Sequence, residues 1–62
     1  MTLGKCATIN TMQGQLYKVR FFDFSLRYGR YVLTEEKVIS NIEAAKHLID
    51  NKGYLYREHP KF

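Results

Sequence analysis

The sequence has little of several residue types that mark particular classes of protein. Its 62 residues include one cysteine, one proline and no tryptophan. A lone cysteine, Cys6, cannot form an internal disulfide, which excludes a disulfide-stapled secreted mini-protein. No apolar run approaches the roughly 20 residues of a membrane-spanning helix, and the N-terminal segment lacks a signal-peptide core. We therefore expect a soluble, cytoplasmic protein with no membrane partner.

Residues for catalysis and for metal or cofactor binding are equally scarce. Cys6, His47 and His59 are scattered, and no motif around them pairs a nucleophile with a base. These side chains are also too few for a structural zinc site. The glycines lie far apart and form no phosphate-binding loop. The sequence thus predicts a non-enzymatic protein with no catalytic residues, no metal and no cofactor.

What the sequence does contain is the composition of a folded protein. It is 45% hydrophobic and 15% aromatic, whereas disordered chains have few aromatics. The length predicts a single domain, residues 1–62. Five tyrosines and four phenylalanines exceed what one helix on one sheet can enclose. Some should lie at the surface, where tyrosine favours contact with a partner, and a homodimer is one way to cover them.

One stretch, from Ser40 to Gly53, carries both a start and a stop signal for a helix. Ser40 can cap the first free amides, and Glu43 can reach back to the Ser40 amide. Gly53 can take the left-handed conformation in which helices often end. Apolar residues then fall on one side at helical spacing: Ile42, Ala45, Leu48 and Ile49. We expect one amphipathic helix over about residues 41–52 (Asn41 to Lys52).

The first part of the chain predicts a hairpin. Lys5–Met12 alternates weakly and contains β-branched residues that suit a strand. Gln13-Gly14 is a plausible tight turn before a second strand over residues 15–24. In that strand Tyr17, Val19 and Phe21 share one face, opposite Leu16, Lys18, Arg20 and Phe22. The doubled Phe21-Phe22 interrupts the alternation and indicates a bulge.

The middle of the chain leaves two readings open. Residues 25–29 favour a loop, residues 30–33 a strand, residues 34–36 a turn and residues 37–39 another short strand. The alternative is a helix that begins at Thr34 and runs to Lys52. Val38-Ile39, two β-branched neighbours, argue against that longer helix.

The chain closes with a strand over residues 54–58, ended by Pro60. The element order is therefore β-β-β-(β)-α-β. We expect an α+β fold, a small, mostly antiparallel sheet of three to five strands with one amphipathic helix packed on one face. Because no second helix is predicted, the other face should be open to a partner.

The strongest functional signal is the basic and aromatic stretch of residues 17–31. Lys18, Arg20, Arg27 and Arg30 interleave there with aromatic side chains, as in proteins that bind single-stranded nucleic acid. The other account, which we favour for most of these residues, is that Tyr17, Phe21 and Phe24 form the core under the helix and the charges are a solvated outer face. Tyr28, Arg27 and Arg30 are the residues that we place outside the core.

Two functions follow from these patterns. The preferred one is a small interaction module that docks on a larger, acidic-surfaced protein and modulates or inhibits it, as small phage and mobile-element proteins of similar element order do by fold-level analogy. Its basis is the small size, the absence of catalytic groups, the excess of tyrosine and the open sheet face. We prefer it to the second function because the net charge of +4 is spread along the whole chain. The second is a nucleic-acid binder, with single-stranded DNA or RNA favoured over duplex.

The expected interaction surface comprises Lys18, Arg20, Arg27, Tyr28, Arg30, Tyr54, Tyr56 and Arg57. The pattern leaves open whether Tyr54 and Tyr56 face the helix or solvent.

Overall fold

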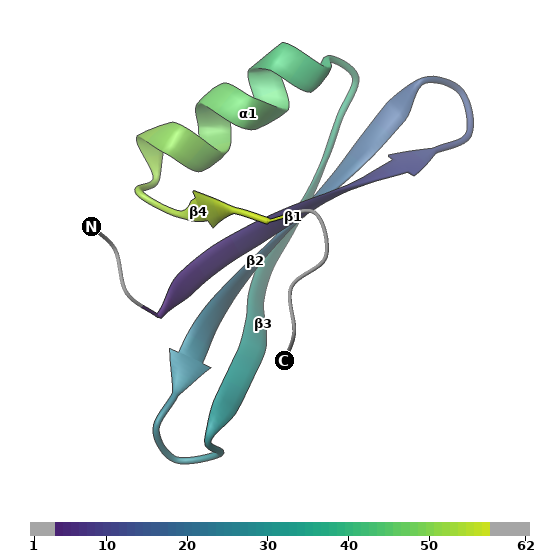
Figure 1. Ribbon diagram of the computed structural model, residues 1–62. Coiled ribbons are helices and arrows are strands. Elements are labelled where there is room, and N and C mark those ends of the chain that lie inside the picture. The colour runs from purple at the N-terminus through teal and green to yellow at the C-terminus, as the bar shows by residue number, and fades with distance from the viewer. Residues whose placement is uncertain (1–3, 58–62) are drawn as a thin grey trace.

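The computed structural model describes residues 4–57, which form a single sheet with a helix across it (Figure 1). Its elements are β1 (Lys5–Met12), β2 (Leu16–Ser25), β3 (Arg30–Ile39), α1 (Ile42–Asn51) and β4 (Leu55–Tyr56). The strands lie in the order β3-β2-β1-β4. The α+β class and the order β-β-β-α-β confirm the predicted fold. The helix in this part of the chain is too short and too polar to cross a membrane.

The sheet is antiparallel except at one edge. β1 pairs with β2 and β2 with β3, both antiparallel, whereas β4 lies parallel to β1. The predicted first hairpin is confirmed, although β2 begins at Leu16 because the turn also takes in Gln15. Gly14 and Gln15 both have positive φ, 75° and 59°, which is the conformation that tight hairpin turns require.

β3 is one continuous strand, so the predicted turn over residues 34–36 is wrong, as is the alternative helix beginning at Thr34. Pairing with β2 along its whole length overrides the weak strand preference of this polar segment. A bulge does occur opposite Phe21 and Phe22, as predicted, because these residues pair with Glu35 and Leu33. The extra residue is Thr34, whose hydroxyl donates to the Phe21 carbonyl at 3.2 Å.

α1 begins one residue later than predicted, and its cap is Asn41 rather than Ser40. Asn41 Oδ1 accepts the amides of Glu43 at 2.8 Å and Ala44 at 3.3 Å. Asparagine and serine are about equally good caps, so the sheet decides between them by setting where β3 ends. Gly53 leaves the helix with φ of 76°, as predicted.

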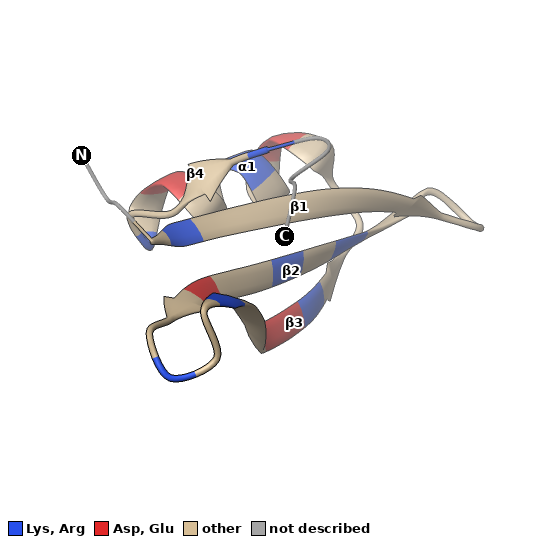
Figure 2. Cartoon of the chain, turned by 60° about the horizontal axis from the view of Figure 1, so that its bottom comes forward, with Lys and Arg blue, Asp and Glu red and all other residues tan. Residues whose placement is uncertain are grey.

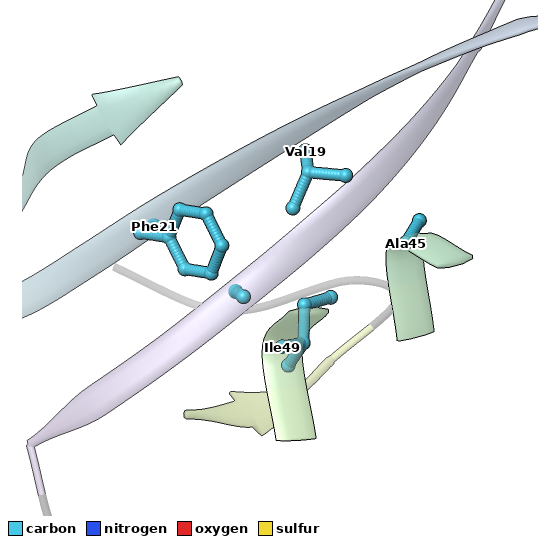
Figure 3. Packing of buried hydrophobic residues seen from close by; sticks show 5 residues of the cluster. Val19, Phe21, Ala45 and Ile49 are labelled. Atoms are coloured by element: carbon cyan, nitrogen blue, oxygen red, sulfur yellow. The ribbon is translucent and has the colours of Figure 1, made fainter. Parts of the chain in front are cut away.

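The core lies between α1 and the two central strands (Figure 3). Phe21, Val19 and Ile49 are its largest fully buried side chains. Ala7 and Ala45, both without exposed area, let the helix approach the sheet closely. Burial of Phe21 alone is worth roughly 2–3 kcal/mol.

The end of α1 is tied to β3 by charge. Lys52 Nζ lies 2.7 Å from Glu35 Oε1 and 5.2 Å from the centre of the Phe21 ring. The hydrogen bond from Lys52, with the charges of Lys52 and Lys37, lowers the pKa of Glu35 below its usual 4.5. Glu35, on the edge strand β3, thus connects this strand to the C-terminal end of α1.

The cap assignment predicts a difference between two neighbouring substitutions. Asn41→Ala should lower the free energy of unfolding by about 1 kcal/mol, because two helix amides lose their acceptor. Ser40→Ala is the matched control and should leave stability unchanged. Urea denaturation followed by circular dichroism measures both, and an equal loss for Ser40→Ala would contradict the assignment.

The Glu35 pair predicts a pH dependence of stability. A carboxylate whose pKa is lower in the folded state stabilises above its unfolded pKa, and this contribution is lost as the pH falls through the folded pKa. The urea midpoint should therefore decrease below about pH 4.5. Glu35→Gln should flatten that decrease more than Glu43→Gln, which removes a carboxylate from the other end of α1. Identical pH profiles for the two variants would rule out this role for Glu35.

Candidate interaction surface

The face of the sheet away from α1 is not uniformly exposed. No other element in residues 4–57 lies on this face, yet its two central side chains on β1, Cys6 and Thr8, are 3% and 7% exposed. Their cross-strand neighbours are Phe22 and Arg20. Burial raises the pKa of the Cys6 thiol, so this cysteine is a packed residue.

The predicted basic residues of β2 lie on this face and are partly neutralised. Arg20 Nε lies 2.8 Å from Glu36 Oε2, and Lys18 Nζ lies 3.9 Å from Glu36 Oε1. In Figure 2 the basic segments of β2 run beside an acidic segment of β3. Lys18 and Arg20 thus share one carboxylate, which weakens the field that they present to an anionic partner.

Three other lysines also have carboxylate partners. Lys37 and Lys52 both contact Glu35, and Lys5 Nζ lies 3.3 Å from Asp23 Oδ2. Within residues 4–57, the cations outside every ion pair are Arg27, Arg30, Lys46 and Arg57. Within this range, pairing therefore leaves unpaired cations in three places: the β2–β3 hairpin, α1 and the residue after β4.

Arg27 and Arg30 lie at the loop end of the β2–β3 hairpin. We call residues 24–33 the hairpin end. This segment contains no acidic residue. It exposes large apolar side chains: Leu26 at 92%, Tyr28 at 62%, Leu33 at 51% and Phe24 at 43%. Figure 2 shows its loop, with a basic segment, projecting beyond the sheet.

The loop is held by its own backbone. The Gly29 amide donates to the Ser25 carbonyl at 2.7 Å, and the Tyr28 amide lies 3.3 Å from Ser25 Oγ. Gly29 has φ of 65°, which disfavours other residues. The guanidinium of Arg27 lies 5.7 Å from the centre of the Tyr28 ring. The predicted loop is confirmed over residues 26–29, whereas Ser25 still belongs to β2, and the loop side chains are presented on a defined turn.

Beside the loop the surface is hollowed. An open hollow of about 490 Å³ is lined by Gly4, Lys5, Asp23, Phe24 and Tyr31. The rings of Phe24 and Tyr31 meet edge to face with centres 5.3 Å apart. The prediction that Phe24 forms the core is wrong, because alternation along β2 places it on the face opposite Phe21.

The C-terminal site residues lie apart from the hairpin end. Tyr54 faces α1 and the core: its ring packs 5.0 Å from that of Phe21, and its hydroxyl donates to Asp23 Oδ1 at 2.7 Å. Tyr56, 37% exposed, and the exposed Arg57 belong to the opposite sheet edge. The eight predicted residues therefore form no single surface.

Sequence reasoning singled out Arg27, Tyr28 and Arg30 but missed their apolar neighbours. Leu26 and Leu33 carry no motif, and only a loop position and an edge strand mark them as exposed.

Within residues 4–57 no group of acidic, histidine or cysteine side chains could hold a metal ion. No protein-family model, curated protein or solved structure matches the chain.

The shared carboxylate of Glu36 generates a prediction about polyanions. Glu36→Gln should release Lys18 and Arg20 and make the protein elute from heparin at higher salt. Glu43→Gln changes the net charge equally but lies on α1, away from any pair that we describe. If both variants shift equally, the net charge alone matters and Glu36 does not mask the two cations.

Proposed function

We propose that this chain is a small non-enzymatic interaction module that docks on a larger, acidic-surfaced protein through the hairpin end and thereby modulates or inhibits it. The observation that carries this proposal is the combination of exposed Leu26 and Tyr28 with Arg27 and Arg30, on a segment without acidic residues. Tyrosine and arginine are among the residues that most often dominate binding energy at protein interfaces.

The local geometry supports the same proposal. A turn held by hydrogen bonds to Ser25 loses little conformational freedom when it docks, so less binding energy is spent on ordering it. Leu26 is almost fully exposed and has no role in the core. An apolar side chain presented in this way gains free energy when a partner covers it.

The nucleic-acid alternative has less support. A single-strand binder needs a continuous cationic track with stacking rings. Lys18 and Arg20 would provide that track on β2, but both contact Glu36. Within residues 4–57, the unpaired cations close in sequence to an exposed ring are Arg27 and Arg30 near Tyr28, and Arg57 next to Tyr56 at the opposite sheet edge. Neither group is long enough for such a track.

Affinity capture with matched variants tests the proposal. The immobilised protein should retain a discrete host protein that mass spectrometry identifies, that binds again after purification and that changes activity when the chain is added. Arg27→Ala with Tyr28→Ala should lose at least about tenfold in affinity. Lys46→Ala with His47→Ala removes a cation and a ring from the exposed side of α1 and should bind as the parent does.

Two outcomes would reject the proposal. One is that the loop variant and the α1 variant bind the purified partner equally. The other is that single-stranded oligonucleotides bind more tightly than any protein, with an affinity that falls steeply with salt.

A further inference from the structure

Resting on the proposed function, we infer the form of the partner's recognition element. It is a short acidic segment that inserts one aromatic or large apolar side chain into the hollow beside Phe24. Its carboxylates meanwhile contact Arg27 and Arg30. The inference specifies what the hairpin end recognises, whereas the proposed function specifies only that it docks.

The hollow has the size and the walls for one such side chain. Its volume of about 490 Å³ lies within the range of ligand pockets. Phe24 and Tyr31 contribute rings to its lining, and Lys5 contributes an alkyl chain and an ammonium group. A ring entering here would lie against Phe24 and within reach of a cation, which favours an aromatic occupant.

The walls are fixed by contacts between distant parts of the chain. The Phe24 amide donates to the Gly4 carbonyl at 2.6 Å, which joins the end of β2 to the residue before β1. Asp23 accepts from both Lys5 and Tyr54, at 3.3 and 2.7 Å. At Gly4, φ is +81° and an added Cβ would lie 3.4 Å from the Phe24 Cβ. The hollow is therefore preformed, which lowers the cost of filling it.

The charges around the hollow favour a negatively charged segment of the partner. The register pairs Arg30 with Ser25, so the backbone of Arg30 lies one residue from Phe24 and Tyr31, which both line the hollow. Asp23 is the acidic group in the lining, and its two oxygens are already engaged by Lys5 and Tyr54. Carboxylates on the entering segment would thus meet two arginines that have no carboxylate partner in residues 4–57. Arginine binds carboxylates in a bidentate geometry, which adds direction to this attraction.

Synthetic peptides test the inference by titration into ¹⁵N-labelled protein, observed by NMR. The probe is a short peptide of aspartate and glutamate with a central phenylalanine. One control replaces that phenylalanine by alanine, and the other replaces all of the acidic residues by lysine. The amides of Gly4, Phe24 and Arg30 should shift in a saturable way with the probe. The alanine peptide should bind at least about tenfold more weakly, because a ring partly covered in an open hollow gains somewhat less than a fully buried one. The lysine peptide should not bind.

Variants of the protein separate the contribution of the Phe24 ring from that of the arginine charges. Phe24→Ala should reduce the difference between the phenylalanine and alanine peptides to less than about twofold, while retaining the preference for acidic peptides. Arg27→Glu with Arg30→Glu should abolish binding of both acidic peptides. Lys46→Glu with Arg57→Glu makes the same change in net charge elsewhere and should retain most of the affinity.

Several outcomes would overturn the inference: equal binding of the phenylalanine and alanine peptides, equal loss in the two charge-reversed variants, shifts outside the hairpin end, or no saturable shift. A failed peptide titration leaves the proposed function standing if capture of the purified partner still depends on Arg27 and Tyr28. If that capture does not depend on them, the proposed function itself fails.

Discussion

Strands β1, β2 and β3 and the helix α1 all meet at the side chain or backbone of Phe21. Its ring, without exposed area, packs against α1 and edge to face on Tyr54, and Lys52 lies over it. Its backbone pairs with Ala7 on one side and Glu35 on the other, and its carbonyl accepts the Thr34 hydroxyl. A chain of this length has a small margin of stability, so one well-packed ring governs much of the arrangement.

The bulge beside Phe21 decides where the charges lie. Without the extra residue in β3, strict alternation would put Glu35 on the same face as Leu33 and Glu36 beneath the helix. With Thr34 inserted, Glu35 lies under α1 within reach of Lys52, and Glu36 lies opposite Arg20 on the other face. One local irregularity therefore neutralises cations on both faces of the sheet. The unpaired arginines of the β2–β3 hairpin stand beyond it, at the hairpin end.

What the sequence could predict was local, and what it could not predict depends on pairing over long range. The first hairpin, the loop at residues 26–29 and the helix end at Gly53 follow from turn and cap chemistry within a few residues. The continuous β3 does not, because the polar stretch after Leu33 favours a turn until β2 supplies partners for it. The position of Phe24 could have been predicted, because the two-residue alternation of β2 already places it on the face opposite Phe21. The prediction that it lies in the core relied on its aromatic character instead.

The same limit applies to the candidate site. Arg27, Tyr28 and Arg30 stand out in the sequence because a loop exposes them, and the structure places all three at the hairpin end. The hollow joins Gly4 and Lys5 to residues about twenty positions later, a proximity that only the strand register creates. The ion pairs of Glu36 likewise span 16 residues or more. Composition alone made the positive charge look diffuse, because it cannot show which cations are neutralised.

The exposure of the hairpin end follows from a mismatch of lengths. α1 has ten residues and spans about 15 Å, whereas the ten-residue strands β2 and β3 each extend about 33 Å. The helix covers only part of the sheet, and the β2–β3 end extends past it (Figure 1). Apolar side chains there contribute little to the core, and exposed apolar surface favours association. Folding does not explain the exposure of Leu26, Tyr28 and Leu33, whereas a partner that covers them would, and the arginines among them fit the acidic surface that we propose for that partner.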